Sequence, residues 1–508
     1  MPGTRCGIKS MRTNAYQQLE KRFRRIHLLK SIGNLLRWDG EVMMPSGSTG
    51  IRAEQLALLE TESNSILRAK QTATLLDGAE SAQAELDEWQ SANLREMRRL
   101  WLHANAIPNR LVHAFHRVTT EAENRWRRAV EENDFGVLTA SLRKVVEVLR
   151  EKGRYLGEAL GVGPYDALLD VHDAGRTTAE LDSIFRRVRA DVAPMLGPVM
   201  QRQSAQPCVE ITVPVPIGRQ KTLCKTVMKD IGFPFHKGRL DESLHPFTEG
   251  TAEDIRVTTR FDEHDFLSGL MGVLHETGHA MYDYSLPAAW ATQPVGRDRG
   301  MAIHESQALL LEMIIGRSRE FMQYCAPLAA QVFAVGGEQY SALNLYRLAT
   351  RVRPSLIRMD ADEVTYSMHV LLRWELEREL FDGSLDVGEL PQAWNEKMHA
   401  YLDIVPGSDR EGCLQDSHWP LGYFGYFPTY MVGQVIAAQL YAIVRRDLPG
   451  VETTVAGGDF APLFSWLNRN IYAEGARLST TQLLAKVTGE AANPDYLLAY
   501  LRDKYLTD

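Results

Sequence analysis

The sequence predicts a mainly helical protein with one small β-sheet. Apolar residues recur every three or four positions over most of the chain, and only residues 208–261 depart from this pattern. The 508 residues are 44% hydrophobic and 24% charged, a composition that can bury a large core. No repeat and no low-complexity linker divides the chain, so we expect a single large helical body.

The first 200 residues read as a series of amphipathic helices. Six segments carry apolar residues on one face and charges on the other: Ala15–Leu36, Glu54–Leu67, Ala82–Leu102, Leu111–Glu132, Val137–Leu160 and Thr178–Met195. Residues 1–10 lack this pattern and are interpreted as a flexible tail, which leaves 11–508 as one domain. Met1 and Met11 are both candidate start residues.

The sequence pattern of residues 208–261 is typical of short β-strands. VEITVPVPI begins this region and DIRVTTRF ends it, with a stretch broken by glycine and proline between them. Alternating β-branched residues between turn signals predict a few strands there. Helical periodicity returns near Glu263 and continues to the end of the chain.

Charge and cysteine content exclude several classes of protein. With 57 basic and 65 acidic residues the net charge is −8, which argues against a nucleic-acid partner. The five cysteines form no CxxC pair, as is typical of a reducing compartment. The apolar run Met431–Val444 is shorter than the roughly 18 residues that a membrane span requires, and no apolar segment follows the basic N-terminus. We therefore expect a cytoplasmic protein without a membrane partner.

The sequence HETGH at residues 275–279 is the strongest functional feature. His275 and His279 lie one turn apart on the same face of a predicted buried helix, so both imidazoles can bind one metal ion. Glu276 is one step around this helix. It can reach a water at the ion without being a ligand, which is the geometry of a general base.

A catalytic site of this kind needs a third ligand from a neighbouring element. Glu305 opens another apolar helix 26 residues after His279, and a reversal of the chain would bring it beside the two histidines. The resulting His2Glu set leaves the fourth position of a zinc ion open for water. Glu312 is a competing carboxylate, and His304 is an alternative ligand or a nearby supporting residue.

Further short motifs lie in order along the chain. They are RWDGEVMMPSGSTGIRAEQLALL at 37–59, His245-Pro246-Phe247, Asp254-x-Arg256-x-Thr258, HETGHAMYD followed by HESQ, Ile357-Arg358-x-x-Ala361-Asp362 and Gly412-x-x-Gln415-Asp416-x-His418-Trp419. Over residues 15–505 the chain resembles the M32 metallocarboxypeptidases, the carboxypeptidase Taq family. Three positions depart from the family pattern: Ala308-Leu309 replaces a Ser-Arg pair, and Asp283 stands where glutamate is more usual.

The resemblance implies a helical fold with a deep active-site groove and a homodimeric assembly. It implies one zinc ion per chain, which cobalt can replace, and release of single residues from the free C-terminus of peptides. The implied side-chain specificity is broad, with poor handling of a C-terminal proline. The HExxH motif and the distant Glu305 are of the gluzincin type.

An exopeptidase also needs a group that binds the terminal carboxylate of its peptide, and arginine matches a carboxylate with two hydrogen bonds. The resemblance indicates Arg358, with Arg256 as second choice. Each has a structural alternative, an ion pair with Asp362 or Asp254. Other candidate substrate contacts are His245 and the possible oxyanion donors His418, Tyr423 and Tyr430.

Three rival interpretations remain open from the sequence. An endopeptidase could use the same metal site, whereas an aminopeptidase is disfavoured because LSGLMGVL replaces the usual GxMEN motif. A helical scaffold with a structural metal site would need no base at Glu276. A cysteine nucleophile at Cys413 is disfavoured because nothing in the sequence marks its thiol as activated.

Overall fold

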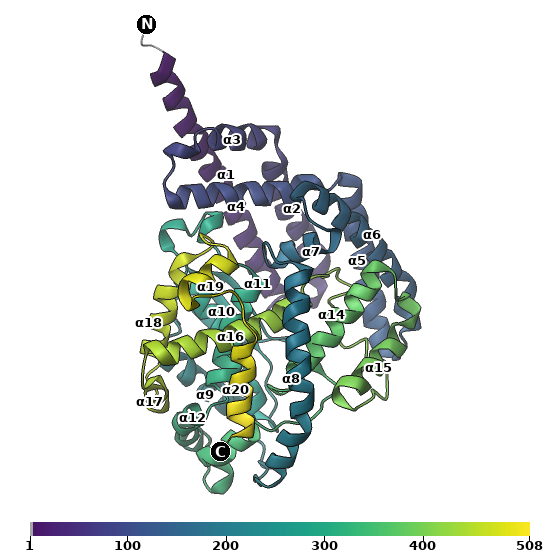
Figure 1. Ribbon diagram of the computed structural model, residues 1–508, viewed down its shortest axis with the longest axis vertical. Helices are drawn as coiled ribbons and strands as arrows, with labels where there is room; N and C mark the ends of the chain where they lie inside the picture. Colours follow the sequence, from purple (N-terminus) through teal and green to yellow (C-terminus); the bar gives the residue numbers. More distant parts are fainter. Residues whose placement is uncertain (1–3, 508) are drawn as a thin grey trace. The chain divides into compact units, whose positions relative to one another are not determined.

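The computed structural model describes residues 4–507, with side chains from Ala15 onward, and helices make up 71% of the structure. A three-stranded sheet is present, so the prediction of a mainly helical fold with a small sheet is confirmed. Helices dominate the ribbon in Figure 1. Residues 1–3 of the expected tail lie outside the described residues, and helix α1 begins at Thr4. Flexibility of residues 1–10 stays a prediction.

The chain folds into two compact units, each assembled from three separate stretches. Unit 1 comprises Met1–Asn105, Ile211–Leu343 and Ile443–Ala491, and unit 2 comprises Ala106–Glu210, Asn344–Ala442 and Ala492–Asp508. Because no unit is continuous in sequence, the composition shows no boundary. A single domain over residues 11–508 stays a prediction.

Unit 1 begins with four helices that enclose a core around Leu19, Phe23 and Leu76. They are α1 (Thr4–Val42), α2 (Thr49–Arg68), α3 (Lys70–Glu80) and α4 (Glu88–Ala106). The helix predicted from Ala82 starts only at Glu88. Residues 83–85 form the 3-10 turn η2, and the Asp87 side chain accepts a hydrogen bond from the backbone N–H of Gln90, which caps the new helix.

The sheet of unit 1 contains β1 (Gly238–Glu242), β2 (Phe247–Thr251) and β3 (Asp254–Thr259). Its order is β1-β3-β2, with β1 parallel and β2 antiparallel to β3. The expected strand at DIRVTT is therefore present. The strand expected at VEITVPVPI is wrong: Pro214 and Pro216 have no N–H to donate to a ladder, and helix α9 (Ile217–Ile231) follows at once.

The remaining helices of unit 1 follow the sheet along the chain, and the first of them carries the HETGH segment. They are α10 (Phe266–Ser285), α11 (Met301–Leu309), the π-helical turn η5 (Leu310–Ile315), α12 (Arg319–Phe333), α17 (Val451–Ala456), α18 (Ala461–Asn470) and α19 (Thr480–Thr488), with short turns η3 (Ala288–Trp290), η4 (Pro294–Gly296), η6 (Glu338–Tyr340) and η9 (Tyr472–Glu474). Helix α10 is buried along most of its length.

Unit 2 is built almost entirely from helices. They are α5 (Asn109–Glu132), α6 (Gly136–Leu160), α7 (Pro164–His172), α8 (Thr178–Ser204), most of α13 (Ala342–Ala349), η7 (Arg358–Asp360), α14 (Tyr366–Asp382), η8 (Val387–Glu389), α15 (Leu390–Leu402), most of α16 (Phe427–Asp447) and α20 (Asp495–Leu506). Among the described residues, only α16 is long and apolar enough to span a membrane, and 83% of its apolar window is buried inside the protein. In this structure α16 is a core helix.

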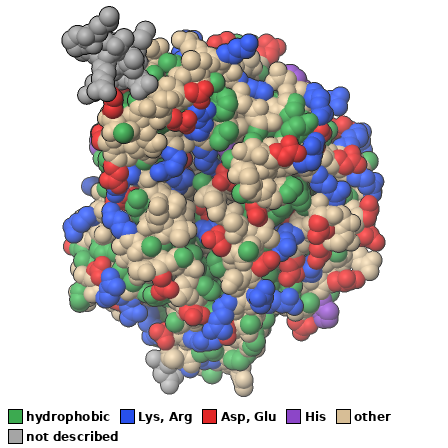
Figure 2. Space-filling model, turned by 45° about the horizontal axis from the view of Figure 1, so that its top comes forward, with side chains coloured by type: hydrophobic (Ala, Val, Ile, Leu, Met, Phe, Trp, Pro, Cys, Tyr) green, Lys and Arg blue, Asp and Glu red, His purple; other side chains and the backbone are tan. Residues whose placement is uncertain are grey.

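Charges of both signs are interspersed on the face of the molecule seen in Figure 2. Some exposed charged residues of the protein form ion pairs along a single helix. On α5, Arg127 pairs with Glu123 at 2.7 Å and Arg128 with Glu132 at 2.8 Å. Such exposed pairs contribute little to stability, and here they show that the basic runs of α5 are solvated helix faces.

Candidate active site

Two helices of unit 1 bring the predicted metal ligands together. Nε2 of His275 lies 3.8 Å from one carboxylate oxygen of Glu305, and Nε2 of His279 lies 3.7 Å from the other. The three ligand atoms are all within 4.8 Å of one another. Glu305 is only 2% exposed. Two imidazole nitrogens and a carboxylate at this spacing fit a zinc-type divalent ion.

Glycine makes the close approach of these helices possible. A Cβ atom on Gly278 of α10 would lie 2.5 Å from the carbonyl oxygen of Gln307 and 2.7 Å from Cα of Ala308, both on α11. Any side chain at 278 would therefore push α11, and Glu305 with it, away from the two histidines. The departure from the family pattern at Ala308 and Leu309 leaves two fully buried apolar residues at this contact.

The outer nitrogen of each histidine has a partner that orients the ring. Nδ1 of His279 is 3.1 Å from the carbonyl oxygen of His304, so it must donate, and its Nε2 keeps a lone pair for a metal. Nδ1 of His275 is 3.0 Å from Oε2 of Glu312. Arg317 donates to the other oxygen of Glu312 at 2.8 Å. Glu312 thus supports His275 through its outer nitrogen.

Electrostatics in this cluster are dominated by burial and by the carboxylates. Burial opposes charge on His275, but Glu305 and Glu312 outweigh it and raise the pKa of this imidazole to about 10. A metal ion must therefore compete with a proton at His275. Despite burial, His275 and Arg317 lower the pKa of Glu312 to about 2, so this carboxylate is ionised.

His304 lies beside the ligands, stacked on His279 with ring centroids 4.3 Å apart. Its Nε2 is 3.1 Å from Oδ1 of Asp283. Burial opposes protonation, but Asp283 raises the pKa of His304 to about 9. The ring is therefore held as a donor to Asp283, and its backbone carbonyl orients His279. The aspartate that departs from the family pattern belongs to this supporting layer.

Glu276 is held in place by a residue that sequence analysis missed. Oγ1 of Thr248 on β2 donates to Oε2 of Glu276 at 2.7 Å, and Glu276 is 6% exposed. Burial raises the pKa of Glu276, and His275 and this hydrogen bond oppose the increase. A carboxylate with a raised pKa accepts a proton more readily at neutral pH. No signal in the sequence around Thr248 indicates its contact with a residue 28 positions away.

The other candidates in unit 1 occupy the sheet. Nε and Nη2 of Arg256 donate to the two carboxylate oxygens of Asp254 at 2.8 and 2.9 Å, and the guanidinium lies 4.1 Å from the ring centre of Trp38. This is the structural ion pair that the sequence offered as the alternative. His245 is exposed in the turn between β1 and β2.

Unit 2 contains a second cluster, centred on Asp416. Arg358 donates to Oδ1 of Asp416 at 3.1 Å, and Arg373 on α14 donates to Oδ2 at 2.6 Å. The alternative partner Asp362 is engaged elsewhere: it accepts hydrogen bonds from the N–H groups of Arg353, Val364 and Thr365. The alternative pairing of Arg358 with Asp362 is wrong, because the carboxylate of Asp362 already accepts hydrogen bonds from these backbone N–H groups.

The three aromatic candidates near the second cluster differ in their contacts and in their exposure. Arg358 lies 4.8 Å from the ring centre of Tyr430. Nε2 of His418 is 3.4 Å from the hydroxyl of Tyr430. Tyr423 is 48% exposed. The structure therefore places Tyr430 and His418 beside Arg358, and Tyr423 at the surface of the same loop.

Glu377 anchors the loop that carries these groups. It is fully buried on α14 and accepts hydrogen bonds from the Tyr165 hydroxyl and the Gly425 N–H, both at 2.5 Å, and from Nε1 of Trp419 at 2.8 Å. Gly425 has φ +82°, and a Cβ there would lie 2.9 Å from the backbone of Leu168. The loop can therefore follow this path only with glycine at 425.

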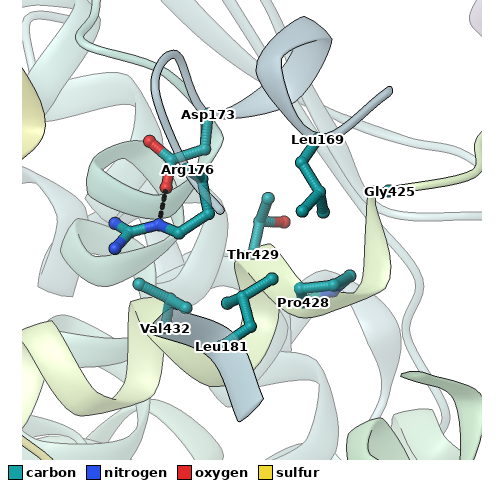
Figure 3. A pocket seen from close by; sticks show the side chains of 8 residues that line it. All are labelled: Leu169, Asp173, Arg176, Leu181, Gly425, Pro428, Thr429 and Val432. Carbon is teal, nitrogen blue, oxygen red and sulfur yellow. Dashed lines mark hydrogen bonds and ion pairs between the residues drawn. The ribbon is translucent and has the colours of Figure 1, made fainter. Parts of the chain in front are cut away.

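A small hollow in unit 2 has no residue of either cluster in its lining. It is too narrow to hold a water molecule and is lined mainly by apolar side chains (Figure 3). Its charged groups, Asp173 and Arg176, pair with each other at 2.8 Å. None of the residues singled out from the sequence lines it. Its chemistry offers no nucleophile and no set of metal ligands.

The geometry and the comparisons with known proteins agree on the class of protein. Two histidines of HETGH and a glutamate from α11 form a donor set that fits a divalent metal ion, and the carboxylate of Glu276 lies on the same helix as the histidines. A sequence profile of the carboxypeptidase Taq (M32) metallopeptidases matches residues 18–505. The chain belongs to this family.

Relatives with known names cover nearly the whole chain. Thermostable carboxypeptidase 1 of Thermus thermophilus is 35% identical over 502 residues, which are 97% of this chain and 98% of the relative. Carboxypeptidase 1 of Bacillus subtilis is 33% identical over 96% of this chain and 98% of its own. Among solved structures, Trypanosoma cruzi metallocarboxypeptidase 1 has a TM-score of 0.95 at 38% identity and covers 97% of this chain and 99% of that one. These similarities support a metal-dependent carboxypeptidase.

Proposed function

We propose that this protein removes single amino acids from the free C-terminus of peptides, with broad side-chain specificity. The observation that carries the proposal is the position of Glu276, which lies on the same helix as two convergent histidines. Its carboxylate is buried and accepts a hydrogen bond from Thr248. A structural metal site would not need such a group. Membership of the M32 family supports the peptidase class.

His275, His279 and Glu305 would hold one zinc ion, for which cobalt can substitute. The support is chemical: two imidazoles and a carboxylate are a catalytic zinc set, which leaves a coordination position open. When bound, the ion supplies Lewis-acid activation of the attacking water and of the scissile carbonyl. Glu312 and the carbonyl of His304 keep the two rings oriented during turnover.

Glu276 carries the proton through the reaction. Its carboxylate accepts a proton as water attacks the last peptide carbonyl, and the resulting acid donates this proton to the leaving amine. Burial favours this shuttle because it raises the pKa of Glu276. Thr248 donates to Oε2 of Glu276 and so leaves the second oxygen for the water.

Arg358 would bind the terminal carboxylate of the peptide. Its side chain is 10% exposed and its guanidinium is held in one orientation by Asp416, which favours recognition of a planar anion. Tyr430 and His418 contact the same cluster and are the better candidates for the donor that stabilises the oxyanion, with Tyr423 the exposed third. Arg256 is a weaker candidate for a substrate contact because it is already paired with Asp254. His245 is a weaker candidate because it lies exposed in a turn.

The remaining expectations concern assembly and location. We propose a cytoplasmic homodimer that acts on peptides and has no nucleic-acid or membrane partner. The net charge of −8 and the mixed surface charges support the absence of a nucleic-acid partner. A mass near one chain in light scattering at micromolar concentration would refute the dimer.

The direct test is mass spectrometry of peptide digestion. The zinc-loaded or cobalt-loaded protein receives one peptide as its free acid and as its C-terminal amide, each with and without chelator. We expect stepwise loss of single residues from the free acid only, abolished by the chelator. Internal cleavage of both forms would identify an endopeptidase instead. No cleavage of either by a protein that retains its metal would favour a structural metal site.

A further inference from the structure

The second cluster contains more positive than negative charge. Arg358 and Arg373 share one carboxylate, and among the described residues no other acidic group contacts either guanidinium. The two arginines share the carboxylate of Asp416: its Oδ1 accepts a hydrogen bond from Arg358, and its Oδ2 accepts one from Arg373. Two guanidinium groups and one carboxylate carry a net charge of +1.

The titratable neighbours do not change this balance. His418 lies 3.7 Å from Asp416, and His369 precedes Arg373 by one turn of α14. Burial lowers the pKa of both imidazoles to about 3; Asp416 opposes and the two arginines reinforce the decrease. Both rings are therefore neutral at physiological pH. Of the other acids near Arg358 in the chain, Asp360 is exposed and Glu363 is paired with Lys504 at 2.6 Å.

The two arginines differ in what they can touch. Arg373 is fully buried, and all three of its nitrogens donate to protein atoms: Asp416, Gln415 and the carbonyl of His369. Arg358 is partly accessible, and none of the described residues accepts a hydrogen bond from its Nη1. Gln415 joins them, since its Oε1 accepts from the backbone N–H of Arg358 and from Arg373.

We propose that Arg373 is a positioning residue that supplies the unmatched positive charge through which Arg358 captures the peptide carboxylate. This rests on the proposed function of Arg358. With Asp416 alone, Arg358 would form a closed, neutral pair, and a substrate carboxylate would have to compete with Asp416. Arg373 binds one of the two carboxylate oxygens of Asp416, so the negative charge of Asp416 is shared between the two arginines. An incoming carboxylate then completes a buried set of two arginines and two carboxylates.

The test compares two substitutions that treat the charge differently. Arg373→Gln keeps hydrogen-bonding capacity but makes the cluster neutral, and Arg373→Lys keeps the charge. For a free-acid peptide we expect Arg373→Gln to raise KM by about 10- to 100-fold with little change in kcat. Arg373→Lys should stay within about threefold of the wild type, since its ammonium preserves the net charge. Circular dichroism and metal content establish that each variant is folded and loaded.

A double variant separates charge balance from structural damage. Arg373→Gln with Asp416→Asn restores the net charge to +1, so KM should fall back toward the wild-type value. If Arg373 were only structural, the second substitution would add to the damage and KM would rise further. Should Arg373→Gln fail to fold, Asp416→Asn alone decides: a cluster of +2 should lower KM for the free acid, and a raised KM would overturn the proposal.

Different experimental results would refute the role of Arg373 and the proposed function. Equal cleavage of free acid and amide by the wild type would overturn both. If the wild type prefers the free acid and Arg358→Ala loses this preference, Arg358 has its proposed role. An unchanged KM in a folded Arg373→Gln would then refute only the contribution of Arg373.

Discussion

Nδ1 of His275 lies 3.0 Å from Oε2 of Glu312, a residue of the π-helical turn that follows α11. Arg317 holds the other oxygen of the same carboxylate at 2.8 Å. This chain of contacts fixes the orientation of one metal ligand from the side opposite to the metal. It also explains why two glutamates seven residues apart have different tasks: Glu305 faces the inner nitrogens, and Glu312 the outer one.

Replacement of Glu312 should weaken metal binding. In Glu312→Ala, His275 loses the acceptor that orients its ring, so we expect metal affinity to fall about 10- to 100-fold. Competition with a chelator measures this directly, without an activity assay. Glu338→Ala, at an exposed glutamate of the same unit, is the matched control and should bind metal like the wild type. Equal affinities in both variants would refute the supporting role of Glu312.

Replacement of Glu276 should separate catalysis from metal binding. Glu276→Gln keeps the size of the side chain and removes the proton acceptor, so we expect kcat to fall by at least about a hundredfold with metal content unchanged. Thr248→Val removes the hydroxyl that lies 2.7 Å from Oε2 and 3.0 Å from the backbone carbonyl oxygen of Glu276, and it should cause a smaller loss. Substantial turnover by a metal-loaded Glu276→Gln would exclude Glu276 as the general base.

Arg358 and Arg256 make a matched pair of arginines. Arg358→Ala should raise KM for free-acid peptides about 10- to 100-fold, since a charge-assisted contact with the carboxylate is lost. Arg256→Ala removes an arginine already paired with Asp254 and should leave KM near the wild-type value. Steady-state kinetics on one peptide decides between them. The reverse result would transfer carboxylate recognition to Arg256.

Gly278 sets the spacing of the two metal-binding helices. In Gly278→Ala the new methyl group would meet Gln307 and Ala308 of α11, so we expect a stability loss of about 1–3 kcal/mol and weaker metal binding. Gly50→Ala is the control, because a Cβ there meets nothing within 4 Å in helix α2. That substitution should be neutral or slightly stabilising. Chemical denaturation and chelator competition report the two effects, and wild-type behaviour of Gly278→Ala in both would refute the close contact.

Glu377 should make stability depend on pH. Burial raises its pKa from 4.5 to about 7 in the folded protein, against the pull of its three hydrogen bonds. The folded state therefore keeps a proton that the unfolded state releases near pH 4.5, and this contribution to the free energy of unfolding falls as pH rises from about 4.5 to 7. The fall is at most about 3 kcal/mol.

The measurement is the difference in unfolding free energy between the wild type and Glu377→Gln at several pH values. The glutamine cannot titrate, so the other ionisable groups cancel in the difference. We expect the wild type to lose stability relative to Glu377→Gln as pH rises through this window. A difference that is flat from pH 4.5 to 7 would show that folding does not raise the pKa of Glu377.

Local sequence patterns predicted those features that depend on neighbouring residues. The helical period correctly placed α1, α2, α5, α6, α8 and α10, because an amphipathic stripe arises from residues within a few turns of each other. The same logic failed at VEITVPVPI, where alternation of β-branched residues indicated a strand. Pro214 and Pro216 prevent a hydrogen-bonded ladder there, so the segment forms no strand.

The sequence by itself determined the helical class, the small sheet near DIRVTT and the pairing of His275 with His279 on one helical face, because each follows from spacing along a few turns of chain. Only the tertiary structure decided which carboxylate faces the imidazoles, that Thr248 holds Glu276, and that Arg358 meets Asp416, 58 residues away. These contacts join segments whose approach is set by helix packing and by the fit of residues such as Gly278, and no local periodicity encodes them.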